Sequence, residues 1–187
     1  MGSLAAAIIF IVVIIVLIIW FVGVYNRLVG LRNRVDTQWA NIDVELKRRY
    51  DLIPNLVETV KGYAAHERET LQRVVEARQI AIDAKSLEEQ GQAEGMITSA
   101  LRSIFALAEA YPDLKANQNF LQLQGQLSEI ENVIANARSL YNEAVLQFNN
   151  VVQMFPSNIV AGMSGFGLRE FFEVVDAEAR EAPKVEF

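Results

Sequence analysis

The only histidine of the chain is the residue with the greatest potential for metal chemistry. His66 lies in the run Ala65-His66-Glu67-Arg68-Glu69. A zincin-type motif needs a second histidine four residues later, so that both imidazoles share one helix face. Position 70 is Thr70, so this chemistry fails and a histidine on a helix surface is the simpler interpretation. The chain also has no cysteine, which excludes thiolate catalysis and Cys-ligated metals. We therefore predict no metal site.

Three glycines near the C-terminus are spaced as in some phosphate-binding loops. They are Gly162, Gly165 and Gly167. A phosphate loop lies between a strand and a helix N-terminus, usually with a following lysine, and the sequence predicts neither. An apolar loop that folds back on the protein is favoured, with contact to a partner or to a membrane as the alternative. We predict no catalytic residue, no cofactor and no small-molecule substrate.

A short basic cluster, Lys47-Arg48-Arg49, has acidic residues on both sides, at Asp43, Glu45 and Asp51. This mixture favours a solvated face of surface ion pairs. The formal net charge is −6, and it belongs to the body of the protein because the N-terminal apolar segment is uncharged. An acidic body argues against nucleic acid as a partner and against binding flat on anionic lipid.

The chain begins with a short tip at residues 1–3, followed by an apolar segment at residues 4–24. At 1.5 Å per residue, about 21 residues span roughly 31 Å, the thickness of a bilayer's hydrocarbon core. A cleaved signal peptide would need a basic start and small residues at its end, and both are missing. We predict a retained transmembrane helix, with these residues as anchor positions: Leu4, Ile8, Ile15, Trp20 and Val24.

Three arginines follow the apolar segment closely, at Arg27, Arg32 and Arg34, whereas no basic side chain precedes it. Basic residues in short flanks remain on the cytoplasmic side of a membrane. This topology signal predicts a cytoplasmic body.

Apolar residues then recur at intervals of three and four from Leu28 to Ala64 and beyond, which is the period of a helix. We predict helices over about 25–85, kinked at Pro54, and over 96–110 and 113–155. Strand patterns are absent. The predicted fold class is all-α, with the transmembrane helix continuing into an elongated, antiparallel helical bundle of coiled-coil type at 25–157.

Two further features qualify this bundle. The first is a group of asparagines in its third predicted helix: Asn117, Asn119, Asn132, Asn136, Asn142, Asn149 and Asn150. We expect most of them on the solvent face, and the alternative is a role in fixing helix register. The tail at 158–187 is rich in glycine and phenylalanine, and a short acidic helix is expected near its end. Four tail residues are candidates for a partner or self-association surface: Met163, Phe166, Phe171 and Phe172.

Five segments together resemble the LemA family. They are Tyr25–Arg78, Glu109–Asn132, Ala137–Asn149, FPSNIVAGMSGF at Phe155–Phe166, and the terminal PKVEF. This resemblance implies an antiparallel helical bundle on a single-pass anchor in a bacterial membrane, with no established catalytic activity or cofactor. A magnetosome membrane protein is also similar, which suggests membrane organisation or shaping by analogy.

Two hypotheses for function follow. The first is a non-catalytic scaffold at the bacterial inner membrane, which forms homo-oligomers or organises partners on the lipid bilayer, including other membrane proteins. The alternative is an adaptor or regulatory subunit of a membrane enzyme, such as a protease. A stoichiometric second protein after gentle extraction would indicate the alternative.

Overall fold

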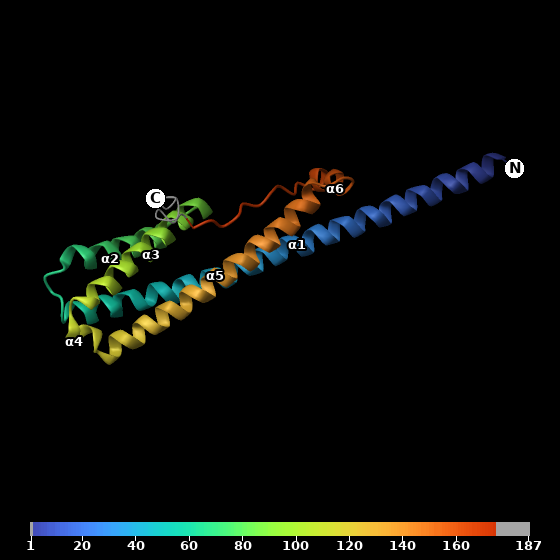
Figure 1. Ribbon diagram of the computed structural model, residues 1–187. Coiled ribbons are helices and arrows are strands. Elements are labelled where there is room, and N and C mark those ends of the chain that lie inside the picture. Colours follow the sequence, from blue (N-terminus) through green and yellow to red (C-terminus); the bar gives the residue numbers. More distant parts are fainter. Residues whose placement is uncertain (1, 175–187) are drawn as a thin grey trace, which may run out of the picture. The chain divides into compact units, whose positions relative to one another are not determined.

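A computed structural model describes residues 2–174 of the chain (Figure 1). Helices account for nearly all of this part, which contains no strand, and the predicted all-α class is confirmed. The helices, in chain order, are α1 (Gly2–Lys61), α2 (Arg68–Asp83), α3 (Leu87–Glu109), α4 (Pro112–Lys115), α5 (Gln118–Gln153) and α6 (Ser157–Met163).

The first third of α1 has no packing partner in its own chain. Residues 3–20 are all exposed, and the most apolar stretch has a mean hydropathy of 3.5 with 0% of it buried. By length and composition this helix can cross a membrane. Figure 1 shows the N-terminal end of α1 extending past α5 and α6. Packing on α1 begins near Leu28, which is 0% exposed.

The described part of the chain divides into two compact units, one formed by residues 2–40 and 139–171, the other by 41–138 and 172–174. Helices α1 and α5 contribute to both. The first unit buries residues of α1, α5 and α6, and these include Leu28, Val35, Ala144, Phe148 and Val160. The second unit packs the rest of α1 and α5 with α2, α3 and α4. Its core includes Ile42, Leu46, Ile53, Leu71, Val74, Ile97, Ile104, Phe120 and Ile130.

The predicted helix over 25–85 is in fact two helices. Pro54 lies inside α1 without ending it, and α1 ends instead at Lys61. In the turn that follows, the Ala64 N–H donates to the Val60 carbonyl at 2.8 Å, and Ala64 is 1% exposed. The apolar spacing persists through this turn because Ala64 and Leu71 face the same core, although the helix has already stopped. His66 lies in the turn and is exposed, rather than on a helix surface.

Helix α3 begins at Leu87, nine residues before the predicted start at 96. A capping box explains the early start: the Ser86 side chain accepts a hydrogen bond from the Glu89 N–H at 3.1 Å, and Glu89 accepts one from the Ser86 N–H at 3.3 Å. Backbone hydrogen bonds from Lys85 and Ser86 lower the pKa of Glu89. Gly91 and Gly95, which precede the predicted start of this helix, are therefore buried helix residues.

The predicted helix over 113–155 and the predicted tail also differ from the structure. The short helix α4 precedes α5, and the Asn117 side chain accepts from the Phe120 N–H at 3.0 Å, which is an N-cap contact. The tail begins with the helix α6, after a cis Phe155–Pro156 bond. Residues 169–174 are not helical, and the rest of the predicted acidic helix lies outside the described residues.

Candidate functional site

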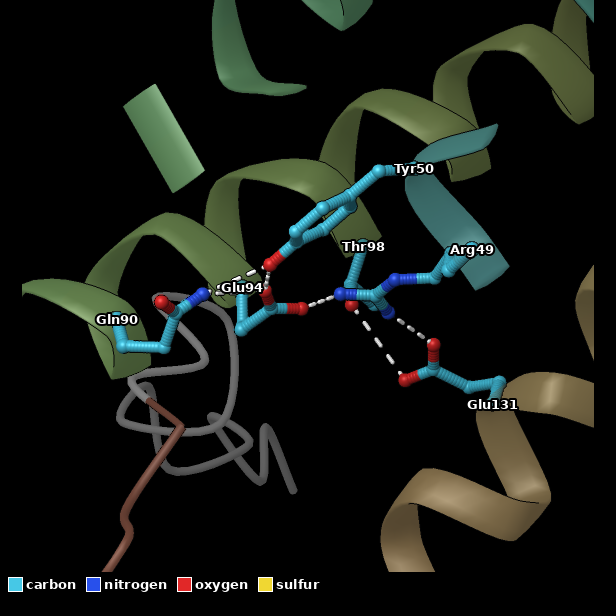
Figure 2. A network of polar contacts seen from close by, with 6 residues as sticks. All are labelled: Arg49, Tyr50, Gln90, Glu94, Thr98 and Glu131. Atoms are coloured by element: carbon cyan, nitrogen blue, oxygen red, sulfur yellow. Dashed lines mark hydrogen bonds and ion pairs between the residues drawn. The ribbon is translucent and has the colours of Figure 1, made fainter. Parts of the chain in front are cut away.

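A buried arginine lies at the centre of the second unit. Arg49, on α1, is 1% exposed. Its guanidinium forms ion pairs with Glu94 of α3, which is 2% exposed, and with Glu131 of α5, at 2.5 Å from Nη1 to Oε2. Figure 2 shows the guanidinium between the two carboxylates. Three helices that are distant in the sequence are thus joined through one side chain.

Hydrogen bonds extend this ion-pair cluster on both sides (Figure 2). The Tyr50 hydroxyl donates to Glu94. The Gln90 amide donates to the Tyr50 hydroxyl at 2.7 Å and to Glu94 at 2.9 Å, while Thr98 contacts Glu131 at 3.5 Å. Both buried charges therefore have several polar partners, as buried charges require. We call Arg49, Tyr50, Gln90, Glu94, Thr98 and Glu131 the polar core.

The electrostatics of the polar core favour fixed protonation states. Burial lowers the pKa of Arg49, and the nearby Glu131 opposes that shift; a guanidinium nevertheless stays charged in proteins. Burial raises the pKa of Tyr50 to about 12, so its hydroxyl remains a neutral donor at physiological pH. A general acid or base works best with a pKa near the operating pH, and neither group meets that requirement. The arrangement is suited to holding helices in register.

A shallow groove of ≈ 240 Å³ adjoins the polar core between α3 and α5. Glu131 and Thr98 line it together with three apolar side chains, Leu101, Phe105 and Leu127, and three polar ones, Arg102, Ser128 and Asn132. Pockets for small molecules usually measure about 300–1,000 Å³, so this groove is small for such a ligand. Among residues 2–174, no group of three or more His, Cys, Asp or Glu side chains is arranged to hold a metal ion.

In the first unit, a second set of polar contacts fixes the segment that follows α6. The Asn149 amide of α5 donates to the Arg169 carbonyl at 2.8 Å and accepts from the Arg169 N–H at 2.9 Å. The Arg169 side chain pairs with Asp36 of α1 at 2.8 Å, and the Tyr141 hydroxyl donates to the Glu170 carbonyl at 3.0 Å. The side chain of Asn149, which is 7% exposed, therefore pairs with both backbone polar groups of Arg169, much as the backbone of a neighbouring β-strand would.

The four candidate tail residues do not form one surface. Phe172 is 1% exposed, so it packs within its own chain, whereas Met163 is 75% exposed and Phe171 is 44% exposed. Phe166 is half-buried, with its ring centroid 5.8 Å from that of Tyr25 and 6.2 Å from that of Phe148. Only Met163 and Phe171 are thus open to a partner.

The three topology arginines all lie on α1, just after the apolar stretch. Arg32 lies over the Phe166 ring, at 5.5 Å from the centroid, and Arg34 donates to the Gln147 side chain at 3.0 Å. Arg27 is exposed. The predicted anchor residues precede them on the same helix, and four of these, Leu4, Ile8, Ile15 and Trp20, are exposed.

Sequence reasoning missed the burial of Arg49 and Glu94, and it named Asn149 only as one of the asparagines in the third predicted helix. The expectation of a solvated face is wrong for Arg49, although Lys47 beside it is exposed and pairs with Asp43 at 2.6 Å. A signal was present, because Arg49 lies three residues after Leu46 and four before Ile53, on the apolar stripe itself. A charge at such a position predicts a buried partner. No comparable pattern marks Glu94 or Asn149.

Comparison with known proteins places this architecture in a family. The model of the LemA family matches residues 38–187. Protein LemA of Metamycoplasma hominis is 30% identical over 145 residues, which cover 75% of this chain and 65% of that protein.

Magnetosome protein MamQ 2 of Paramagnetospirillum magneticum is 25% identical over 175 residues, covering 80% of this chain and 64% of its own length. MamQ of Magnetospirillum gryphiswaldense is 23% identical over 174 residues, which cover 79% of this chain and 64% of that protein. The chain thus matches somewhat less than two thirds of these longer relatives. Together with the apolar part of α1, the matches indicate a membrane-associated protein, and the chain belongs to the LemA family.

Proposed function

We propose that this protein is a non-catalytic scaffold, anchored in the bacterial inner membrane by α1, which self-associates and organises partners from the cytoplasmic side. The observation that carries the proposal is the continuity of α1. The same 60-residue helix contains the apolar stretch and Arg49 of the polar core. A body joined to its anchor by helix, rather than by a flexible linker, suits a protein that holds partners at the membrane.

The chemistry of the body supports a role in assembly rather than in catalysis. Its two buried charges, Arg49 and Glu94, form an ion pair with each other, and the groove beside them is small. Apolar side chains remain exposed on α2, where Val75 is 48% and Ile82 is 46% exposed. These two residues are seven positions apart, so they lie on one helix face. Exposed apolar faces often contact another protein. Relatives named as magnetosome proteins support a link with membrane organisation.

The mass of the full-length protein in lipid nanodiscs or mild detergent tests this proposal. We expect a homogeneous oligomer that persists on dilution. Introducing charge with Val75→Glu and Ile82→Glu should reduce it to smaller species. Val44→Glu is the matched control, because Val44 is 62% exposed on α1 and lies outside this α2 face.

A monomer at all concentrations, with no protein retained on gentle extraction, would overturn the proposal. A monomer that retains one other membrane protein in fixed stoichiometry would replace it with the alternative of an adaptor or regulatory subunit.

A further inference from the structure

A long stretch near the C-terminal end of α5 carries no charge. The last charged residue on α5 is Glu143, and the next in the chain is Arg169, so residues 144–168 are all uncharged. They form the end of α5, the helix α6 and the turn that follows. The formal net charge of −6 therefore resides elsewhere. This end of the first unit can approach an anionic surface without direct charge repulsion.

Helix α6 has one buried face and one exposed apolar face. Val160 is 0% and Ala161 is 1% exposed, whereas Ile159 is 51% and Met163 is 75% exposed. Ile159 and Met163 are four residues apart, so they share a helix face. Just before α6, Met154 is 62% and Phe155 is 79% exposed. We call Met154, Phe155, Ile159 and Met163 the apolar tip.

The apolar tip lies close to the point where the apolar part of α1 ends. The Phe166 N–H donates to the Ala161 carbonyl at 3.0 Å, which ties Phe166 to α6. The Phe166 ring in turn lies edge-on to Tyr25, with centroids 5.8 Å apart. Tyr25 follows the apolar segment directly, and Figure 1 shows α6 beside α1 at the end of α5.

This position corresponds to the interfacial layer of a bilayer. A span that ends at Val24 puts Tyr25 about 1.5 Å further along the axis. The headgroup region extends roughly 5–7 Å beyond each edge of the hydrocarbon. Side chains beside Tyr25 therefore lie at the depth of the lipid headgroups and the first acyl carbons, where Phe, Met and Ile residues of interfacial segments insert.

We propose that the apolar tip is a second membrane contact, which inserts into the lipid interface beside the anchor. This inference rests on the membrane anchoring in the proposed function and adds a lipid-binding surface on α6. Lipid is the occupant because Phe166 links α6 to Tyr25, at the end of the membrane span, and the patch lacks the charges that would orient a protein partner. The exposed Arg27, two residues after Tyr25, is suitably placed for lipid phosphate.

Depth-dependent quenching in vesicles tests the proposal with the full-length chain, which has no native cysteine. An environment-sensitive fluorophore is attached at Met163→Cys and, in a second sample, at Leu140→Cys. Leu140 is the matched control, since it is 42% exposed on α5 in the same unit but lies 14 residues before Met154. A third sample labelled at Ile15→Cys reports the anchor. The vesicles contain phosphatidylcholine and phosphatidylglycerol, with quenchers at shallow or deep acyl positions.

We expect several-fold stronger quenching at position 163 than at position 140, with the shallow quencher more effective, and deep quenching at position 15. Ile159→Glu should lower the quenching at 163 to the level at 140 without loss of fold, because Ile159 is exposed.

Three other outcomes would contradict part of this picture. Equal and weak quenching at 163 and 140, with deep quenching at position 15, would overturn the lipid contact alone. Efficient Met163→Cys cross-linking between two chains, without lipid quenching, would assign the patch to self-association and also overturn it. Absence of quenching at position 15 would instead overturn the anchoring on which the inference rests.

Discussion

Arg49 has a charge at a helix position that would otherwise suit an apolar side chain. Removing a guanidinium and a carboxylate from water has a large desolvation penalty, which their attraction offsets only when geometry and extra hydrogen bonds are good. Here Glu94, Glu131, Tyr50 and Gln90 supply those bonds. An apolar cluster often stabilises helices as well as a buried ion pair does, so we expect the benefit of the polar core to be specificity, because its contacts join defined positions of α1, α3 and α5.

Replacing the cation should therefore be costly. Arg49→Met leaves the buried Glu94 carboxylate without its counter-ion, and we expect a loss of about 3–5 kcal/mol in the free energy of unfolding. Lys47→Met is the control, since the Lys47–Asp43 pair is exposed and worth about 1 kcal/mol or less. Urea unfolding of the detergent-solubilised protein, followed by circular dichroism, measures both. Losses of similar size would show that removal of Arg49 does not leave a costly unpaired charge at Glu94.

The raised pKa of Tyr50 has a consequence at high pH. In the unfolded chain the phenol titrates near its ordinary value of about 10, whereas in the folded protein its pKa is about 12. The folded state therefore holds this proton more tightly. The stability that the protonated Tyr50 phenol contributes is fully present below pH 10 and is lost as the pH rises from 10 to 12.

Tyr50→Phe should remove this part of the pH dependence, roughly 1–2 kcal/mol after allowance for solvent screening. The pKa of Tyr141 is also raised, by burial, and that of Tyr111 by its hydrogen bond to Glu67, so some dependence remains. Unfolding midpoints of both proteins from pH 8 to 12 measure the difference. Parallel pH curves would show that Tyr50 does not contribute.

At the scale of elements, local contacts decide where helices begin and end. The capping box of Ser86 and Glu89 starts α3, and the Ala64 turn separates α1 from α2. In the second unit, the chain after Phe171 lies against α3 so closely that only glycine fits at position 91. A Cβ there would meet the Glu173 carbonyl oxygen at 2.0 Å.

Gly91→Ala should displace residues 172–174 from α3, because a backbone contact cannot be relieved by a change of rotamer. We expect a loss of about 1–3 kcal/mol in stability, typical of overpacking, with faster hydrogen exchange of the amides at 172–174. Gly125→Ala on α5 is the matched control. A Cβ at Gly125 meets nothing within 4 Å, so alanine should stabilise the helix by about 0.5–1 kcal/mol. Stabilisation by both substitutions would disprove the close contact.

At the scale of the whole molecule, the apolar part of α1 and the arginines after it are the features from which we predict the membrane topology. The proposed cytoplasmic body requires the N-terminal tip to lie outside. A single cysteine at Ser3→Cys should then react with a membrane-impermeant maleimide on intact spheroplasts, whereas one at Ser139→Cys should react only after lysis. Both residues are exposed, so access depends on the membrane alone. The reverse labelling pattern would place the body on the other side.

The sequence alone determined the all-α class, the apolar helix and the family, because each depends on composition, period or long motifs that are local to the chain. It did not determine that the turn at Ala64 separates α1 from α2. The spacing of apolar residues shows which side chains are buried, and the buried Ala64 continues that spacing although it lies in a turn. The pairing of Arg49 with Glu94 and Glu131, the binding of Arg169 by Asn149, and the burial of Phe172 were decided only by the tertiary structure. Each joins residues more than 15 positions apart, and no local pattern specifies which distant side chain will complete a buried polar group.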